Sequence, residues 1–121
     1  MRAVDQQLLC ENGDVGDCLR ACVASILDLD PEAVPHFVTK HHWFQALRSF
    51  GKQRQLEIFS ILDPQLVPAN QYTIATGSSP RNPERDHSVV WYQGKVFHDP
   101  HPSRAGLGRE PDYWIVIERK C

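Results

Sequence analysis

The sequence predicts a single α+β domain over residues 1–121, with N-terminal helices packed on a C-terminal antiparallel sheet. Apolar residues recur at helical spacing up to residue 51, and from residue 55 onward they follow the spacing of strands. Helices that precede the strands in this way are typical of an α+β domain. A chain of 121 residues is long enough for one core and too short for two.

The first expected helix lies within GDCLRACVASILDLD, residues 16–30. Asp17 is expected to cap it, because an aspartate carboxylate can accept hydrogen bonds from the free amides of the first turn. Four apolar side chains then follow the i, i+3, i+4, i+7 spacing of one buried face. They are Leu19, Cys22, Val23 and Ile26. Cys22 is therefore expected to be a core thiol, whereas Cys18 stands at the start of the helix.

A short turn in PEAVPHF, residues 31–37, leads to a second expected helix in HHWFQALRSFG, residues 41–51. One face of this helix carries Trp43, Phe44 and Leu47. Gly51 is expected to end the helix, because glycine is favoured just after a helix C-terminus.

Five strands are expected after the second helix. They lie in residues 55–62, 71–77, 87–92, 95–99 and 112–120. The turn-rich run DPQLVPAN separates the first two of these strands. The last strand, DYWIVIERK, has apolar residues on both of its alternating faces.

The charge of the chain excludes some classes of partner. A formal net charge of −2 at pH 7 gives no reason to expect binding to nucleic acid or to an acidic membrane surface. Two arginines, Arg81 and Arg85, cluster in SSPRNPERD, but Glu84 and Asp86 stand among them. This run is expected to be a solvated loop.

The N-terminal run MRAVDQQLLCENGD lacks the apolar region of a secretory signal. The longest apolar stretch, ACVASIL, is far shorter than the roughly 20 residues of a membrane-spanning helix. We therefore expect a cytoplasmic protein whose cysteines are mostly reduced thiols. These cysteines are Cys10, Cys18, Cys22 and Cys121.

No metal or other cofactor is expected. Cys18 and Cys22 have a chelating separation, and so do His98 and His101. No cysteine pair has the short C-x2-C spacing of structural zinc sites, and Cys22 belongs to the expected core stripe.

Cys18 is the strongest candidate for a nucleophile. A cysteine attacks only as the thiolate, and a helix N-terminus favours the anion through its partial positive charge and unpaired amides. A cysteine hydrolase also needs a histidine that accepts and later delivers the proton, and a third polar group that orients this histidine. His87 and Asp99 are the candidates for these roles.

His87 begins one expected strand and Asp99 ends the next. If these strands are joined by a three-residue loop, residues 92–94, with Gly94 in the left-handed conformation, His87 lies opposite Asp99. Cross-strand partners have Cβ atoms about 5 Å apart, close enough for the carboxylate to hold the imidazole. A two-residue loop would instead place His87 opposite Pro100.

The order of cysteine, histidine and aspartate resembles that of papain-like cysteine hydrolases. GDCLRACVASIL is similar to the cysteine-bearing helix of the peptidases that remove double-glycine leaders, and HSVVWYQGKVFHDP is similar to their histidine–aspartate hairpin. A small phage and bacterial papain-like subgroup is more similar still. Its motifs match Asp5-Gln6-Gln7 and residues 16–27, 34–37 and 87–107.

The resemblance implies a papain-like fold and a Cys18–His87–Asp99 triad, with a glutamine upstream of the cysteine that helps to form the oxyanion hole. Gln6 matches the motif of the subgroup, whereas Asn12 has the usual spacing of six residues before the cysteine, so both stay open. His101 and Arg104 lie in the loop after Asp99, and a loop beside a triad often contacts substrate.

These residues predict a hydrolase of an amide, peptide, isopeptide or related acyl bond, whose partner is a peptide or acyl-bearing substrate, proteins included. An acyltransferase or a glutamine deamidase would use the same triad. A binding module without catalysis on the same fold, such as a phage or bacterial interaction protein, is the alternative of a different class. The substrate and the oligomeric state stay open.

Overall fold

The computed structural model describes residues 1–120, and Cys121 lies outside the described residues. The described part contains two helices, α1 (Cys18–Leu27) and α2 (Trp43–Lys52), and five strands. The strands are β1 (Leu56–Ile61), β2 (Thr73–Ser78), β3 (Asp86–Tyr92), β4 (Lys95–His98) and β5 (Tyr113–Arg119). The predicted α+β class is confirmed, and every expected strand begins and ends within two residues of its predicted bounds.

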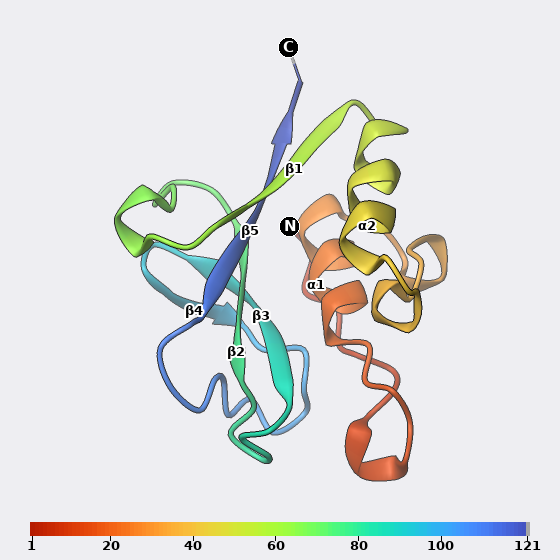
Figure 1. The fold of residues 1–121 in the computed structure, drawn as a ribbon, viewed down its shortest axis with the longest axis vertical. Coiled ribbons are helices and arrows are strands. Elements are labelled where there is room, and N and C mark those ends of the chain that lie inside the picture. The colour runs from red at the N-terminus through yellow and green to blue at the C-terminus, as the bar shows by residue number, and fades with distance from the viewer. Residues whose placement is uncertain (121) are drawn as a thin grey trace.

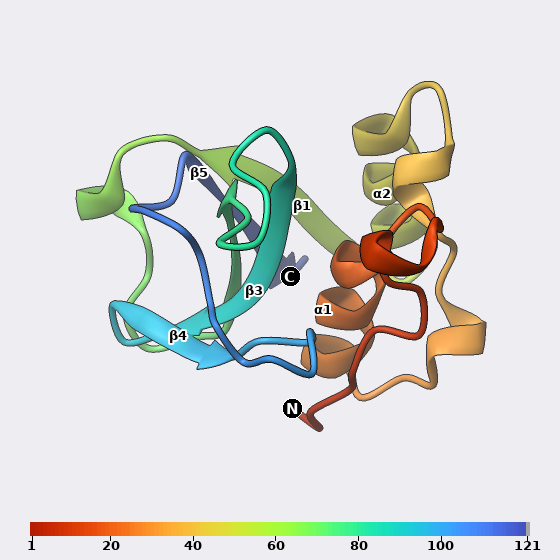
Figure 2. The ribbon, with the colours of Figure 1, turned by 90° about the horizontal axis from the view of Figure 1, so that it is seen from below.

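The five strands form one antiparallel sheet in the order β1-β5-β2-β3-β4. Both helices lie on one side of this sheet (Figures 1 and 2). β5 has neighbours on both edges, and its residues from Trp114 to Ile117 are buried on alternating faces. Apolar residues on both faces of this strand are thus buried.

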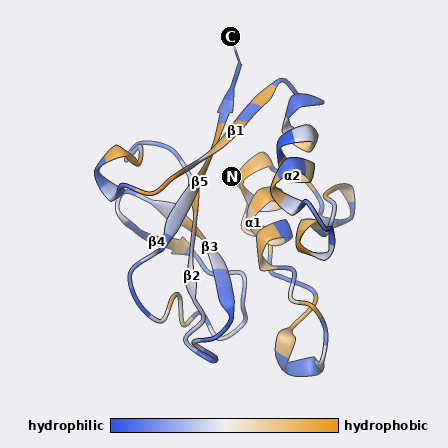
Figure 3. Cartoon of the chain, in the orientation of Figure 1, coloured by the Kyte–Doolittle hydropathy of each residue, from blue (hydrophilic) through white to orange (hydrophobic). Residues whose placement is uncertain are grey.

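The main core lies between the helices and the sheet, where apolar segments of α1 and of the strands face one another (Figure 3). Leu19, Cys22 and Val23 of the predicted stripe are buried, and Ile26 is half-buried at its edge. Burial raises the pKa of the Cys22 thiol well above its usual value, because the thiolate would lose its hydration there. Cys22 is thus a core thiol, as predicted.

Gly51 does not end the second helix, so this prediction is wrong. Gly51 lies inside α2, which continues to Lys52, and it is buried against β1. A Cβ atom at this position would meet the Cδ1 atom of Ile58 at 2.7 Å and its Cγ1 atom at 2.9 Å. The glycine is needed for the close approach of helix and strand rather than for helix termination.

The β3–β4 hairpin differs from the expected three-residue loop. Tyr92 pairs with Lys95 across a two-residue loop, Gln93-Gly94, whose residues both have positive φ angles, 53° and 79°. This is the type I′ geometry, which matches the twist of paired strands better than type I or type II turns do. The left-handed conformation of Gly94 is confirmed, whereas the predicted register is wrong.

The register then shifts again. Trp91 pairs with Val96, but Val90 pairs with His98, so Phe97 is an extra residue on β4. Such a bulge bends the strand that carries it. Pairing ends at His98, and neither Asp99 nor Pro100 becomes a strand partner of His87.

The turn makes a paired prediction. Gly94→Val should lower the free energy of unfolding by about 1–3 kcal/mol, because a β-branched residue is strained at positive φ. Gln93→Asn should raise it by a few tenths to about 1 kcal/mol, because Asn-Gly is the preferred type I′ pair. Urea unfolding of both variants measures this. A Gln93→Asn variant less stable than the wild type would contradict the two-residue turn.

Candidate active site

The three candidate residues lie on three different elements and meet at one place. Cys18 is the first residue of α1, His87 is the second residue of β3, and Asp99 directly follows β4. His87 and Asp99 are both almost completely buried. The Nε2 atom of His87 lies 2.7 Å from the Oδ1 atom of Asp99. The predicted contact between histidine and aspartate is therefore present, although the register that led to it is not.

Asp99 is held by more donors than His87 alone. Its Oδ1 atom also accepts a hydrogen bond from the His101 amide at 2.9 Å, and its Oδ2 atom accepts one from the Gly106 amide at 2.7 Å. Burial opposes ionisation of this carboxyl, but the hydrogen bonds from His87 and from the two amides outweigh it and hold its pKa below the usual range. Asp99 is thus an anion with both oxygens occupied.

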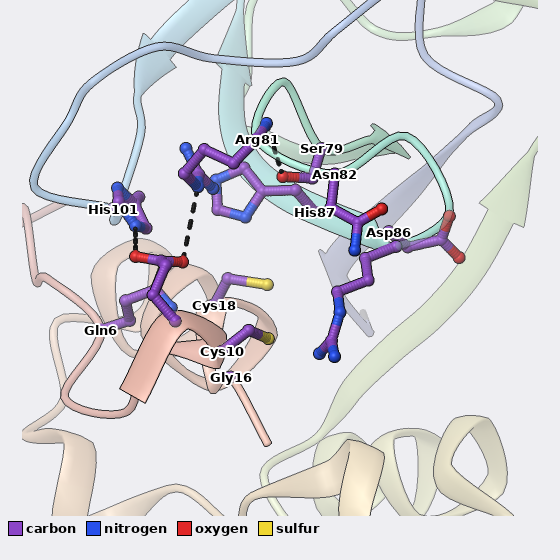
Figure 4. Close-up of a pocket in the computed structure, with 12 residues that line it drawn as sticks. Gln6, Cys10, Gly16, Cys18, Ser79, Arg81, Asn82, Asp86, His87 and His101 are labelled. Carbon is purple, nitrogen blue, oxygen red and sulfur yellow. Dashed lines mark hydrogen bonds and ion pairs between the residues drawn. The ribbon is translucent and has the colours of Figure 1, made fainter. Parts of the chain in front are cut away.

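His87 is poised to carry a positive charge. Burial disfavours the imidazolium, but the interactions with Asp99 and with the Cys18 sulfur prevail and raise the pKa of His87 to about 9. Because Nε2 is bound to Asp99, Nδ1 is the ring nitrogen left for the sulfur. Figure 4 shows Cys18 and His87 on opposite sides of one cavity. A protonated histidine beside a cysteine is one of the arrangements that favour the thiolate.

Asp17 does not cap α1, so this expectation is wrong. No cap hydrogen bond from its side chain is present, and the residue is 1% exposed. Its Oδ1 atom instead accepts from the amides of Gln7 and Leu8, each at 2.9 Å, and its Oδ2 atom lies 3.6 Å from an Arg20 nitrogen. The carboxylate thus binds the N-terminal segment, and the first-turn amides of α1, including that of Cys18, keep no side-chain cap.

Of the two oxyanion candidates, only Gln6 lies at the cavity. Its side chain lines the cavity together with Cys18, whereas Asn12 is exposed in the 3-10 turn Cys10–Asn12 and does not line it. The Gln6 Nε2 atom donates to the Leu8 carbonyl oxygen at 2.8 Å. Within residues 1–120, the buried Oε1 atom of Gln6 has no hydrogen-bond partner. One Nε2 hydrogen of Gln6 remains available for a ligand.

His101, the first of the two expected substrate contacts, lines the cavity. Its Nε2 atom lies 2.8 Å from the Oε2 atom of Glu11, and its Nδ1 atom lies 2.9 Å from the Ser103 hydroxyl. These contacts connect the loop after Asp99 to the 3-10 turn near the N-terminus. His101 thus forms one rim of the cavity and is already bonded at both ring nitrogens.

Arg104, the second expected substrate contact, is not among the lining residues. Its guanidinium donates to both carboxylate oxygens of Asp5, at 2.6 and 2.9 Å, and to the Asp99 carbonyl oxygen at 2.7 Å. The structure therefore makes Arg104 a clamp between the N-terminal segment and the loop after β4. Sequence position alone could not separate a contact with substrate from this contact within the chain.

Cys18 lies between two adjoining cavities of about 290 and 270 Å³. The two cavities share Cys10, Gly16, Cys18, Arg85 and Asp86. We call them the polar cavity, which also contains His87 and Gln6, and the apolar cavity, which has several aliphatic and aromatic side chains in its wall. Together they form a continuous cleft across the nucleophile candidate.

The loop between β2 and β3 contributes site residues that were not predicted from the sequence. Ser79, Arg81, Asn82 and Arg85 line the polar cavity, although this run was expected to be a solvated loop. Arg81 lies 3.7 Å from the Glu11 carboxylate and donates to the Ser103 hydroxyl at 3.0 Å. The position of these residues directly before His87 was the one signal available in the sequence.

Two further features of the described residues bear on the site. No group of three or more histidine, cysteine, aspartate or glutamate side chains gathers as a metal site within residues 1–120. No helix in this part of the chain is both long and apolar enough to cross a membrane.

In comparisons with known proteins, no family model, curated protein or solved structure matches the chain. Any functional assignment therefore depends on the residues and geometry of the site.

The raised pKa of His87 predicts a pH dependence of stability. A free histidine titrates near pH 6.5, whereas native His87 titrates at about 9. Its contribution should be fully present below about pH 6.5 and should be lost as the pH rises towards 9, because the folded state binds the proton more tightly.

Urea unfolding from pH 6 to 9.5 should show this loss in the wild type and a smaller loss in His87→Gln. The difference between the two curves isolates His87 from the other groups that titrate in this range. Parallel curves would mean that His87 is not protonated more readily in the native state.

Proposed function

We propose that this chain is a papain-like cysteine hydrolase that cleaves an amide, peptide, isopeptide or related acyl bond. The observation that carries the proposal is the buried 2.7 Å contact between His87 and Asp99 beside Cys18 at an uncapped helix start. Cys18 would act as the nucleophile, His87 as the general acid and base, and Asp99 as the group that orients the imidazole.

In the proposed reaction the Cys18 thiolate attacks the substrate carbonyl carbon, and the carbonyl oxygen becomes an oxyanion. The free amide of Cys18 and the remaining Nε2 hydrogen of Gln6 would donate to it, and such donors contribute about 3 kcal/mol to transition-state stabilisation. As the carbon–nitrogen bond breaks, His87 delivers its proton to the leaving amine. The product at this stage is a thioester on Cys18.

Water then resolves the thioester, with His87 as the base that takes its proton. The same residues would support two other reactions. Acyl transfer would follow if a nucleophile other than water reached the acyl-enzyme, and glutamine deamidation would follow if the attacked amide were that of a glutamine side chain. This chemistry needs no cofactor. The proposed partner is a peptide or another acyl-bearing molecule, proteins included.

One observation favours the alternative of a binding module without catalysis. The Gln6 side-chain amide already donates to the Leu8 carbonyl oxygen, so it is not wholly free to bind an oxyanion. The buried histidine–aspartate pair favours the enzyme, because burial of ionisable groups costs stability and groups with perturbed pKa values cluster at functional sites. The following experiments separate the two functions.

The first experiment measures thiol reactivity. Iodoacetamide at pH 6 should modify Cys18 well before Cys10, because Cys18 lies at the helix start beside His87. Cys10 is a suitable internal control, since it lines the same two cavities and is also half-buried. Cys22 should react only after unfolding. Mass spectrometry that finds equal rates for Cys10 and Cys18 in the folded protein would count against catalysis.

The second experiment separates loss of the thiol from loss of the fold. Cys18→Ala should cost far less stability than the about 2–5 kcal/mol of a large core truncation, because the side chain lies at the cavity edge. Cys18→Ser and His87→Ala should both abolish turnover, since residues that act as a unit fail together. The readout is hydrolysis of peptide or acyl substrates together with the biological effect. Full retention of that effect by Cys18→Ser would favour the binding module.

The third experiment concerns the orienting residue. Many papain-like enzymes use asparagine in this role, but both Asp99 oxygens accept from N–H donors here. Asp99→Asn would turn an NH2 group towards one of these donors, so we expect a loss of about 1–3 kcal/mol in stability and a large loss of activity.

Asp5→Asn is the matched control. Asp5 also accepts two hydrogen bonds on its carboxylate, from Arg104, but its side chain is about half exposed and lies outside both cavities. Equal effects of the two substitutions would contradict the special position of Asp99.

A further inference from the structure

Cys10 is a thiol at the cleft that the proposed reaction does not use. It lines both the polar and the apolar cavity, as Cys18 does, whereas buried Cys22 lines neither. Cys10 and Cys18 are both half-buried, so a small molecule in the cleft reaches both side chains. In Figure 4 the two sulfur atoms point in the same direction, into the cavity. The cleft therefore holds a second accessible thiol next to the nucleophile candidate.

Gly16 allows the sulfur of Cys10 to lie close to the start of α1. A Cβ atom at Gly16 would meet the Cys10 Sγ atom at 3.0 Å, which is tighter than an ordinary contact. Gly16 stands two residues before Cys18, and the amide of Asp17 between them donates to the Leu8 carbonyl oxygen at 3.4 Å. The segments that carry the two thiols are thus hydrogen-bonded to each other directly beside them.

The residue after Cys10 holds this turn at the cleft. The Oε2 atom of Glu11 lies 2.8 Å from the Nε2 atom of His101, and its Oε1 atom lies 3.7 Å from the Nε atom of Arg81. The turn itself, Cys10–Asn12, contains no buried residue. A small movement of the Cys10 side chain and its turn towards Cys18 therefore disturbs no part of the core.

Two neighbouring thiols, one of them reactive, can be oxidised by hydrogen peroxide in two steps. The Cys18 thiolate attacks one peroxide oxygen, the O–O bond breaks, and the sulfur becomes a sulfenic acid. The hydroxide that leaves takes the proton of the His87 imidazolium and becomes water. The Cys10 sulfur then attacks the Cys18 sulfur, the S–O bond breaks, and the departing hydroxyl leaves with the Cys10 proton as a second water molecule. The two electrons lost by the thiols are gained by the peroxide.

We propose that Cys10 is a resolving cysteine, which forms a reversible disulfide with Cys18 and switches the site off in the presence of peroxide. This inference rests on one part of the proposed function, the reactive thiolate of Cys18, and not on any substrate. A sulfenic acid without a neighbouring thiol is oxidised further to sulfinic and sulfonic acids, which thiol reductants do not reverse. Cys10 would thus protect the nucleophile from permanent loss.

The test treats the reduced protein with hydrogen peroxide and maps its cysteines by mass spectrometry. We expect a disulfide between Cys10 and Cys18, an intact mass lower by two hydrogen atoms, and no iodoacetamide label on either residue. Dithiothreitol should break the disulfide and restore the labelling of Cys18. Electrophoresis without reductant shows whether the bond lies within one chain.

Cys10→Ser removes the resolving thiol, and Cys22→Ala is the matched control. After the same treatment, Cys10→Ser should carry sulfinic or sulfonic acid at Cys18, so dithiothreitol should restore about tenfold less labelling than in the wild type. Cys22 lies in the same helix as Cys18 but lines neither cavity, so Cys22→Ala should keep the disulfide. Circular dichroism confirms that both variants are folded.

The outcomes separate the redox switch from the function on which it rests. If Cys18 is oxidised beyond the sulfenic acid as readily in the wild type as in Cys10→Ser, the reactive thiolate stands and the switch is overturned. A disulfide from Cys18 to Cys121 or to a second chain overturns it as well. If peroxide leaves Cys18 reduced at concentrations that oxidise free cysteine, Cys18 is not a reactive thiolate, and the proposed function fails together with the switch.

Discussion

The hydrogen bonds of the Asp17 carboxylate are the contacts on which the arrangement of the cleft depends. This carboxylate is buried, and a buried carboxylate is costly unless hydrogen bonds replace its hydration. The amides of Gln7 and Leu8 supply these bonds, and Arg20 supplies a nearby positive charge. In return, the segment before α1 is fixed beside the helix start. Gln6 and the 3-10 turn with Cys10 are positioned at Cys18 because of this contact.

The N-terminal segment is also fastened to the opposite side of the cleft. The backbone amide of Gln6 donates to the Pro100 carbonyl oxygen at 3.0 Å. The Arg104 guanidinium donates both to the Asp5 carboxylate and to the carbonyl oxygen of Asp99. Gln6 and Asp99 are therefore parts of one hydrogen-bonded unit.

Local signals in the sequence were enough to predict the strands and the place of Cys18 at a helix start. The strands could be bounded because alternation and turn residues are local properties, and Cys18 was visible because a helix start is a local electrostatic environment. The contact between His87 and Asp99 was predicted for a reason that proved wrong. The register of β3 and β4 is set by a type I′ turn and by a bulge at Phe97. The identities of His87 and Asp99 specify neither feature.

Long-range contacts account for the remaining errors. Asp17 looked like a cap because the amides of its own helix are its neighbours in sequence, while the competing amides of Gln7 and Leu8 lie about ten residues away. Arg104 was expected to contact substrate because its actual partner, Asp5, lies at the other end of the chain.

Long-range contacts also affect how the sheet folds, because β5 lies between β1 and β2. A ribosome releases β1 and β2 long before the strand that must separate them, so the sheet cannot close in the order of synthesis. Such non-local pairing slows folding, and a nascent chain would hold an incomplete cleft until its last strand emerges.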